Sequence, residues 1–394
     1  MSNAKCSVEP ARRVQGVGEY YFSKKLREVA ALRAAGRDII SLGIGGPDRP
    51  PQEAVVEVLC RESRRPDTHS YQPYVGIAEL RQAFAAWYGR HYGVTLDPAT
   101  EIQPLIGSKE GILHISLAFL NRGDGVLVPN PGYPTYTSAS RLAEAEIFTY
   151  DLDAEHGWQP DFEALERMPL DRIKLMWVNY PNMPTGARAT RKTYERLVDF
   201  GRRHNIVICN DNPYSFILND RPESILSVDG AKEICIELNS LSKSHNMAGW
   251  RVGMLASNNR FVEWVLRVKS NIDSGMFRPL QLAAVEALGA DDEWYAEVNR
   301  VYAGRRRVAE RIMDALGCEY DPSQVGLFLW GRVPASEIDA AHMADKLLCG
   351  ADVFVTPGFV FGSNGNNCIR ISLCATRERM EEALGRIVKM KNKI

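Results

Sequence analysis

Strand-like apolar runs alternate with helix-like segments from about residue 100 to about residue 256, and this alternation constrains the fold more than any other feature. Runs such as Ile173–Val178 and Ile234–Leu238 are short and apolar, as expected of buried strands. Strands that alternate with helices form a mainly parallel sheet with helices on both faces. The chain has 394 residues, which is enough for this α/β domain and a second, smaller one.

The stretch Ser240–Gly253 comes directly after the second of these strands and carries the clearest chemical signal. Lys243 stands just past the strand end among hydroxyl residues, a position that suits covalent bonding to a carbonyl if the amine is kept neutral. Ser240 and Arg251 flank this lysine, and side chains of both types bind phosphate groups well. These residues together suit a ligand that carries both a carbonyl and a phosphate and that bonds to a lysine, and pyridoxal phosphate (PLP) is such a ligand.

All fourteen positions from Ser240 to Gly253 also resemble the lysine signature of class I and II aminotransferases, which are fold-type I PLP enzymes. A match of this length is far more specific than an isolated Ser-x-x-Lys, which is usually only an exposed lysine on a loop. Ser240-x-x-Lys243 also fits the start of the penicillin-recognising serine hydrolases, but the Ser-Asp-Asn and Lys-Thr-Gly motifs of those enzymes are absent. The family resemblance covers residues from about 20 to about 375.

The resemblance implies how the chain is divided. It predicts a large PLP-binding domain of residues 51–284, in which helices flank a mainly parallel sheet of the seven-stranded type. Residues 1–50 and 285–394, from the two ends of the chain, are expected to form a smaller α+β domain. The resemblance further implies a homodimer with shared active sites. A helix expected from about Glu293 to Leu316 contains Arg305-Arg306-Arg307, which the sequence predicts to be a solvated face.

Several segments match family residues that hold PLP. Gly107-Ser108-Lys109 opens a predicted helix, where free backbone N–H groups bind anions, and the resemblance assigns this turn to the phosphate. Ser108 as a plain helix cap is an equal alternative. Tyr133 matches the aromatic residue that stacks on the pyridine ring. Asp211 matches the aspartate that keeps the pyridine nitrogen protonated, which makes the ring an electron sink, and Tyr71 matches the tyrosine that reaches a phosphate across the dimer interface.

The loop at residues 179–186 resembles the family's Asn-Pro-Thr-Gly loop with one departure. Met183 stands where the family usually has an asparagine that bonds to the phenolic oxygen of PLP, and methionine cannot donate that bond. We expect Asn182 to reach the cofactor from the neighbouring position. The alternative is that Tyr214 makes this contact alone.

Two further matches concern the substrate. Arg370 lies in an apolar strand-like run, where an unpaired charge is costly, and it matches the family arginine that clamps the substrate α-carboxylate. Gly45 matches the Gly-x-Pro-Asp turn, whose backbone approaches the same carboxylate because glycine has no Cβ. Gly43-x-Gly45 does not complete a dinucleotide-binding motif, since the third glycine is missing and Pro47 interrupts any helix start.

The resemblance therefore implies an aminotransferase that moves an amino group between an L-amino acid and a 2-oxo acid through a Lys243 Schiff base, with Asp211 and Tyr214 as the other catalytic residues. A PLP lyase or synthase of the same fold shares nearly all of these residues and is the alternative. The chain resembles the branch that holds aspartate, alanine and LL-diaminopimelate aminotransferases. The diaminopimelate enzymes carry a Glu where this chain has Tyr74, which counts against a diaminopimelate substrate.

Composition excludes several other classes. The formal net charge of −1 does not favour a nucleic-acid partner, and no apolar run is long enough to cross a bilayer. A ligand-sensing regulator would need an added DNA-binding domain, for which there is little room before the matching region. The eight cysteines are scattered without a Cys-x-x-Cys pair, so the sequence predicts a reduced, cytoplasmic protein without a metal site.

Overall fold

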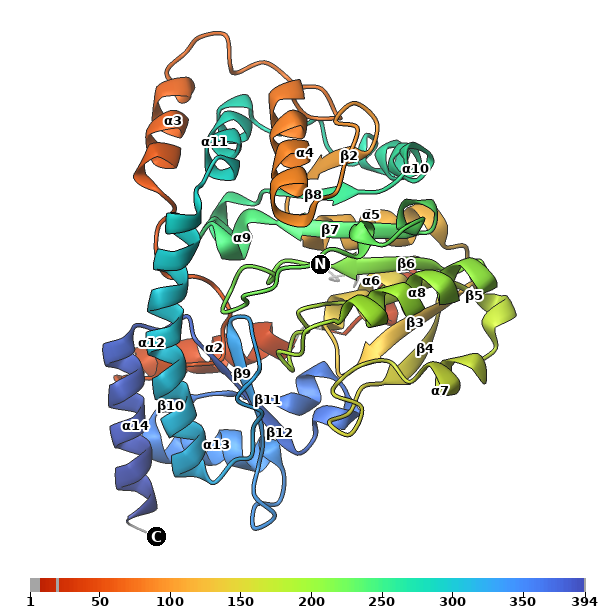
Figure 1. The fold of residues 1–394 in the computed structure, drawn as a ribbon. Coiled ribbons are helices and arrows are strands. Elements are labelled where there is room, and N and C mark those ends of the chain that lie inside the picture. Colours follow the sequence, from red (N-terminus) through yellow and green to blue (C-terminus); the bar gives the residue numbers. More distant parts are fainter. Residues whose placement is uncertain (1–7, 19–20, 393–394) are drawn as a thin grey trace, which may run out of the picture.

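The computed structural model describes residues 8–18 and 21–392 (Figure 1). Its α-helices are α1 (Arg12–Gln15), α2 (Tyr21–Ala34), α3 (Glu53–Ser63), α4 (Ala78–Tyr92), α5 (Ser108–Phe119), α6 (Pro134–Leu142), α7 (Phe162–Glu166), α8 (Arg191–His204), α9 (Leu241–Ser244), α10 (Asn259–Lys269), α11 (Arg278–Leu288), α12 (Asp292–Leu316), α13 (Ala340–Ala351) and α14 (Arg377–Lys391). Its strands are β1 (Ile40–Ser41), β2 (Ile102–Leu105), β3 (Gly125–Asn130), β4 (Glu146–Asp151), β5 (Ile173–Val178), β6 (Val207–Asp211), β7 (Cys235–Ser240), β8 (Gly253–Ala256), β9 (Phe328–Arg332), β10 (Val353–Phe354), β11 (Thr356–Pro357) and β12 (Cys368–Ser372).

A seven-stranded sheet forms the centre of the large part of the molecule. Its strand order is β2-β8-β7-β6-β5-β3-β4, and β8 alone runs antiparallel to both of its neighbours. The inner strands β3, β6 and β7 are buried along their whole length, because helices cover both faces of the sheet (Figure 1). The expected mainly parallel, seven-stranded sheet between helices is confirmed.

The smaller part of the molecule draws on both ends of the chain. β1 pairs with β10 in a two-stranded parallel sheet, and β11, β12 and β9 form a three-stranded antiparallel sheet. The expected small α+β unit built from both termini is therefore present. One hydrophobic core extends from Val55 to Tyr295. A second joins Ile40, Leu42, Met183 and Ile217 to side chains from Val298 onward, so the two cores meet within α12. The boundaries at 50/51 and 284/285 stay predictions.

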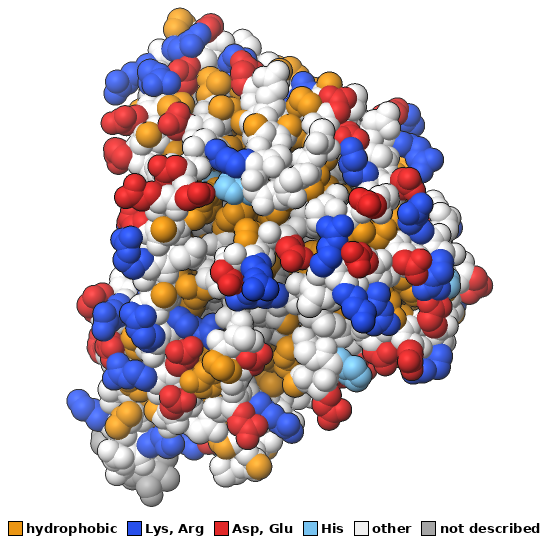
Figure 2. All heavy atoms as spheres, viewed as in Figure 1, with side chains coloured by type: hydrophobic (Ala, Val, Ile, Leu, Met, Phe, Trp, Pro, Cys, Tyr) orange, Lys and Arg blue, Asp and Glu red, His pale blue; other side chains and the backbone are white. Residues whose placement is uncertain are grey.

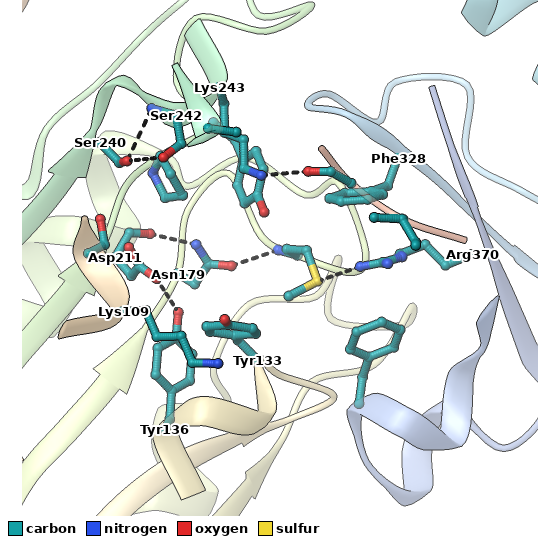
Figure 3. Close-up of a pocket in the computed structure, with 18 of the residues that line it drawn as sticks. Lys109, Tyr133, Tyr136, Asn179, Asp211, Ser240, Ser242, Lys243, Phe328 and Arg370 are labelled. Atoms are coloured by element: carbon teal, nitrogen blue, oxygen red, sulfur yellow. Dashed lines mark hydrogen bonds between the residues drawn. The ribbon is translucent and has the colours of Figure 1, made fainter. Parts of the chain in front are cut away.

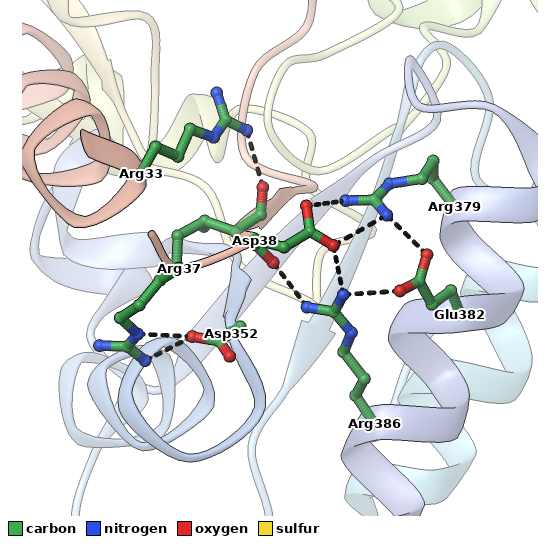
Figure 4. Close-up of polar contacts among 8 residues, drawn as sticks. Arg33, Arg37, Asp38, Asp352, Arg379, Glu382 and Arg386 are labelled. Atoms are coloured by element: carbon green, nitrogen blue, oxygen red, sulfur yellow. Dashed lines mark hydrogen bonds and ion pairs between the residues drawn. The ribbon is translucent and has the colours of Figure 1, made fainter. Parts of the chain in front are cut away.

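Ion pairs fasten the N-terminal segment to the small sheet and helices (Figure 4). Asp38, just before β1, accepts hydrogen bonds from Arg379 and Arg386 of α14, and these bonds lower the pKa of its carboxyl to about 2. Arg37 bonds to Asp352 at the end of α13. These pairs are exposed and therefore contribute little stability each, but they fix the path of the chain into β1.

Two of the three arginines in the run of α12 are buried, which corrects the sequence prediction of a solvated face, while Arg307 is exposed as predicted. Arg305 is buried and makes a two-point ion pair with Asp48, with both N–O distances at 2.7 Å. Arg306 is also buried and donates to the backbone oxygen of Gln324. Periodicity could not show this, because the carboxylate comes from a turn more than 250 residues away in the sequence.

The surface in Figure 2 mixes Lys and Arg with Asp and Glu side chains across the whole face shown, without a region of one sign. Within residues 8–18 and 21–392, none of the helices is both long enough and apolar enough to span a bilayer.

Candidate active site

A cavity of about 350 Å³ opens where the carboxyl ends of β3, β5, β6 and β7 meet the small sheets (Figure 3). Ligands of α/β proteins bind at this edge of the sheet, because the loops that leave the strands converge there. Pockets of a few hundred Å³ are typical for small molecules. The predicted site residues that line this cavity are Gly45, Ser108, Lys109, Tyr133, Asp211, Tyr214, Ser240, Lys243, Arg251 and Arg370.

Lys243 lies in the short helix α9, directly after β7, and its side chain crosses the cavity. Its Nζ donates a hydrogen bond of 2.5 Å to the backbone oxygen of Gly45. Burial lowers the pKa of Lys243, and the positive charges of Arg370 and Arg251 add to this lowering, while Cys374 and Asp211 oppose it. These effects favour the neutral amine, which is the form that bonds to a carbonyl carbon and accepts a proton.

Asp211 is the last residue of β6 and is fully buried. Its Oδ2 accepts a hydrogen bond of 3.0 Å from the hydroxyl of Tyr136, while its Oδ1 has no partner among the described residues. Burial raises the pKa of Asp211 to about 7, although the Tyr136 hydroxyl and Lys243 both oppose this shift. A buried carboxylate oxygen without a partner fits a cationic N–H group of a bound molecule, such as the protonated pyridine of PLP.

The N-terminus of α5, two serines and Arg251 form a polar cup at one end of the cavity. Ser240 Oγ donates to Ser242 Oγ at 2.9 Å, and Arg251 Nη1 lies 3.4 Å from the same Ser242 oxygen. Gly107 does not line the cavity, but it has φ of +79°, and a Cβ there would lie 2.2 Å from Arg251 Nη2. Glycine at this position therefore lets the guanidinium lie against the turn, and the cup fits a phosphate group.

Arg370 occupies the opposite end of the cavity. Its guanidinium carbon lies 3.9 Å from the ring centre of Phe328 and 4.6 Å from that of Phe361. Its Nη2 donates to the backbone oxygen of Gly43 at 2.8 Å, and Nη1 lies 3.0 Å from the sulfur of Met183. A guanidinium held against aromatic rings can present its N–H groups to a carboxylate.

The structure places the neighbouring asparagines differently from the expectation. Asn182 does not line the cavity, and its Oδ1 is bonded to the backbone and hydroxyl of Thr185. Asn179 lines the cavity instead, and its Nδ2 donates to the backbone oxygen of Asp211 at 2.5 Å. Asn179 stands directly after β5, so a polar residue at the end of a buried strand was the signal that could have identified it. The role proposed for Asn182 gains no support from its position.

Tyr71 lies away from the cavity of its own chain. Its side chain is 91% exposed, at the surface loop before α4. The sequence prediction places its hydroxyl in the cavity of a second subunit, and such a role requires an exposed side chain in the isolated chain.

Other proteins share this chain's sequence and fold. The family model for aminotransferase class I and II matches residues 37–387. The LL-diaminopimelate aminotransferase of Nitratidesulfovibrio vulgaris is 42% identical over 383 residues, which are 96% of this chain and 98% of that protein. The enzyme of the same name from Moorella thermoacetica is 41% identical over 389 residues, 98% of this chain and 100% of that protein. Among solved structures, apo-BacF from Bacillus subtilis has a TM-score of 0.93 and 36% identity, with 98% of each chain covered.

Proposed function

The chain belongs to the class I and II aminotransferases, which use PLP, and from this premise we propose the role of each cavity residue in amino-group transfer. The observation that carries the proposal is the layout of the cavity. Four groups face the same cavity: the Lys243 amine, the Asp211 carboxylate, the polar cup and the Arg370 guanidinium. A lyase or synthase is not favoured, because the relatives named above are aminotransferases.

PLP, when bound, withdraws electrons from the substrate Cα and so makes its proton acidic. The Ser240–Ser242–Arg251 cup and the start of α5 would hold the phosphate. Asp211 would keep a proton on the pyridine nitrogen, and Tyr133 would cover one face of the ring. Arg370 would bind the α-carboxylate of the amino acid and thereby place its Cα near Lys243. The neutral Lys243 Nζ would then remove the Cα proton and deliver it to C4′ of PLP, the carbon on the other side of the substrate nitrogen.

We expect Asp211→Asn to lower kcat by about 10²–10³-fold, the loss typical of removing one placed electrostatic group from an active site. The same variant should stabilise the cofactor-free protein at about pH 8. The folded pKa of about 7 lies above the ordinary value of 3.8, so ionised Asp211 destabilises the fold increasingly as the pH rises between these values. The gain should reach up to about 4 kcal/mol above pH 7 and vanish near pH 4.

Thermal unfolding of the cofactor-free wild type and variant across this pH range checks the stability prediction. Turnover of the PLP-loaded forms checks the predicted loss of kcat. Wild-type turnover in the PLP-loaded Asp211→Asn variant would show that another group holds the pyridine proton.

We propose that two copies of the chain form a dimer with shared active sites. The support is a group of exposed apolar side chains on two adjacent segments, namely Tyr71, Tyr74, Ile272 and Phe277. The segments touch, since the backbone at Gly275 packs against that of Gln72. Burial of such side chains against a second copy would be favourable.

Co-expression of Tyr71→Ala chains with Lys243→Ala chains tests the sharing. In a mixed dimer, one site would combine an intact Lys243 with an intact Tyr71 from the other chain. At limiting PLP, we expect the mixture to recover up to about a quarter of wild-type turnover, while each variant alone stays near zero. If the mixture is as inactive as the separate variants, Tyr71 does not act across the interface. Light scattering of the wild type measures the mass of the assembly.

Two classes of amino donor are favoured by different observations. The relatives' names favour LL-diaminopimelate, at 41–42% identity over nearly the whole chain. The apolar side chains of Leu26, Ile44, Met183 and Phe361 in the cavity wall favour an apolar L-amino acid instead. A half-transamination screen, in which the visible spectrum of bound PLP changes on amino transfer, decides between them. The argument from Tyr74 against diaminopimelate stays a prediction that the same screen tests.

We also propose that the enzyme works in the cytoplasm. In the described part of the chain the cysteines are free thiols, as expected in a reducing compartment.

A further inference from the structure

A buried network of charged side chains lies behind the phosphate cup and outside the cavity. It consists of Glu110 and His114 on α5, Lys269 at the end of α10, and Asp273 in the loop that follows. The Lys269 side chain is only 1% exposed, which is rare for a lysine unless it is paired. None of the four residues lines the cavity, and none has a part in the chemistry described above.

Lys269 joins the two carboxylates of this network. Its Nζ donates to Asp273 Oδ2 and lies 3.7 Å from Glu110 Oε1. The same Glu110 oxygen accepts a hydrogen bond of 2.7 Å from His114 Nε2, which must carry the proton because a carboxylate can only accept. The lysine ammonium occupies the place that a bound cation would need, so this cluster is not an ion site.

Glu110 connects the network to the turn that forms the phosphate cup. Its Oε2 accepts a hydrogen bond of 2.5 Å from the backbone N–H of Ile106, and Ile106 directly precedes Gly107. Glu110 lies in the first turn of α5, so its carboxylate bridges the two ends of the turn from 106 to 110. This bridge fixes the direction in which the N–H groups of Ser108 and Lys109 point.

Asp273 connects the network to the loop that carries Tyr71. Its Oδ1 accepts a hydrogen bond of 3.1 Å from the backbone N–H of Gly275. Gly275 has φ of +85°, and a Cβ there would lie 2.5 Å from the backbone oxygen of Gln72, the residue after Tyr71. The 273–275 turn is thus packed directly against the Tyr71 loop.

We propose that Glu110, Lys269 and Asp273 are positioning residues that set the geometry of the phosphate site from behind. Lys269 holds the cup turn of its own site through Glu110. Through Asp273 it also holds the loop whose Tyr71 is assigned to the phosphate of the second subunit, so one buried ammonium aligns an element of each phosphate site. Buried ion pairs often add little stability over apolar residues of the same size, so a role in positioning accounts better for three charged groups here. This inference rests on the proposed function, which places the PLP phosphate at this cup.

Pyridoxal lacks the phosphate of PLP, so comparing the two compounds isolates the effect of the network on phosphate binding. The dissociation constants of both compounds are measured by titrating the cofactor-free full-length wild type and the variants Lys269→Met, Glu110→Gln and Asp273→Asn. We expect the PLP constant to rise about 10–100-fold in each variant, by analogy with metal sites, where removal of a residue that orients a ligand has an effect of this size. The pyridoxal constant and kcat at saturating PLP should stay near wild-type values. Lys269→Arg, which keeps the charge, should restore part of the PLP affinity.

Lys346→Met serves as a control for the loss of a paired lysine far from the cup. Lys346 pairs with Glu337 at 2.8 Å in the small part of the molecule, so its loss should leave PLP affinity unchanged. If Lys269→Met does not fold, the milder Glu110→Gln and Asp273→Asn variants carry the test.

Two outcomes would overturn the proposal in different ways. If the variants lower the melting temperature of the cofactor-free protein but keep the wild-type ratio of PLP to pyridoxal affinity, the network only stabilises the fold. If the wild type itself binds PLP and pyridoxal equally tightly, the phosphate is not held at this cup, and the proposed assignment of the cup fails as well.

Discussion

Lys243→Ala is expected to lower amino-acid turnover by at least about 10⁴-fold, the upper end of what one placed acid–base group contributes. The variant loses both the amine that bonds to PLP and the base that moves the Cα proton. Burial lowers the pKa of Lys243, which favours the neutral form of the wild-type amine. Steady-state kinetics of the PLP-loaded variant measures the loss.

The variant should nevertheless fold and bind PLP without a covalent bond, because Asp211 and the phosphate cup are unchanged. Small primary amines added to the solution should restore part of the turnover, since they replace the missing group. Borohydride reduction of the wild type followed by peptide mapping should place the cofactor on Lys243. A label on Lys109 or Lys269 would contradict the assignment.

Arg370→Lys is expected to lower kcat/KM for amino acids by about 2–5 kcal/mol of transition-state stabilisation, or ~30-fold to ~5,000-fold. Lysine keeps the charge and can still donate to the backbone oxygen of Gly43. It lacks the planar guanidinium that contacts Phe328 and Phe361, and it cannot present two parallel N–H groups to a carboxylate. The melting temperature and the PLP content should therefore stay close to those of the wild type.

Simple amines provide the matched comparison, because they lack the carboxylate. The rate with 2-phenylethylamine should change little in the variant, while the rate with L-phenylalanine falls. A stable, PLP-loaded Arg370→Lys protein that processes amino acids as efficiently as the wild type would mean that another group binds the α-carboxylate. A large loss of folding stability would indicate that Arg370 is mainly a structural residue.

The sequence alone was sufficient for the family, the sheet and most of the cavity. Lys243, Asp211 and Tyr133 lie at or just after the ends of strands that are clear from local apolar patterns, and parallel strands bring their carboxyl ends to one edge. Residues at these strand ends therefore lie close together at that edge of the sheet, and this does not depend on the exact paths of the loops. The length of the motif around Lys243 then indicated the chemistry, and the comparisons confirmed the aminotransferase family and its PLP cofactor.

Only the tertiary structure decided which neighbouring side chains face the cavity. Asn179 and Asn182 belong to one loop, and the path of its backbone, which the sequence pattern does not show, turns the first toward the cavity and the second toward Thr185. Ion pairs between residues far apart in the sequence were also not predictable from the sequence pattern. Arg305 was expected at the surface, yet it is buried against Asp48. Lys269 likewise meets Glu110 behind the phosphate cup. Such pairs join residues far apart in the chain, so only packing of the elements brings them together.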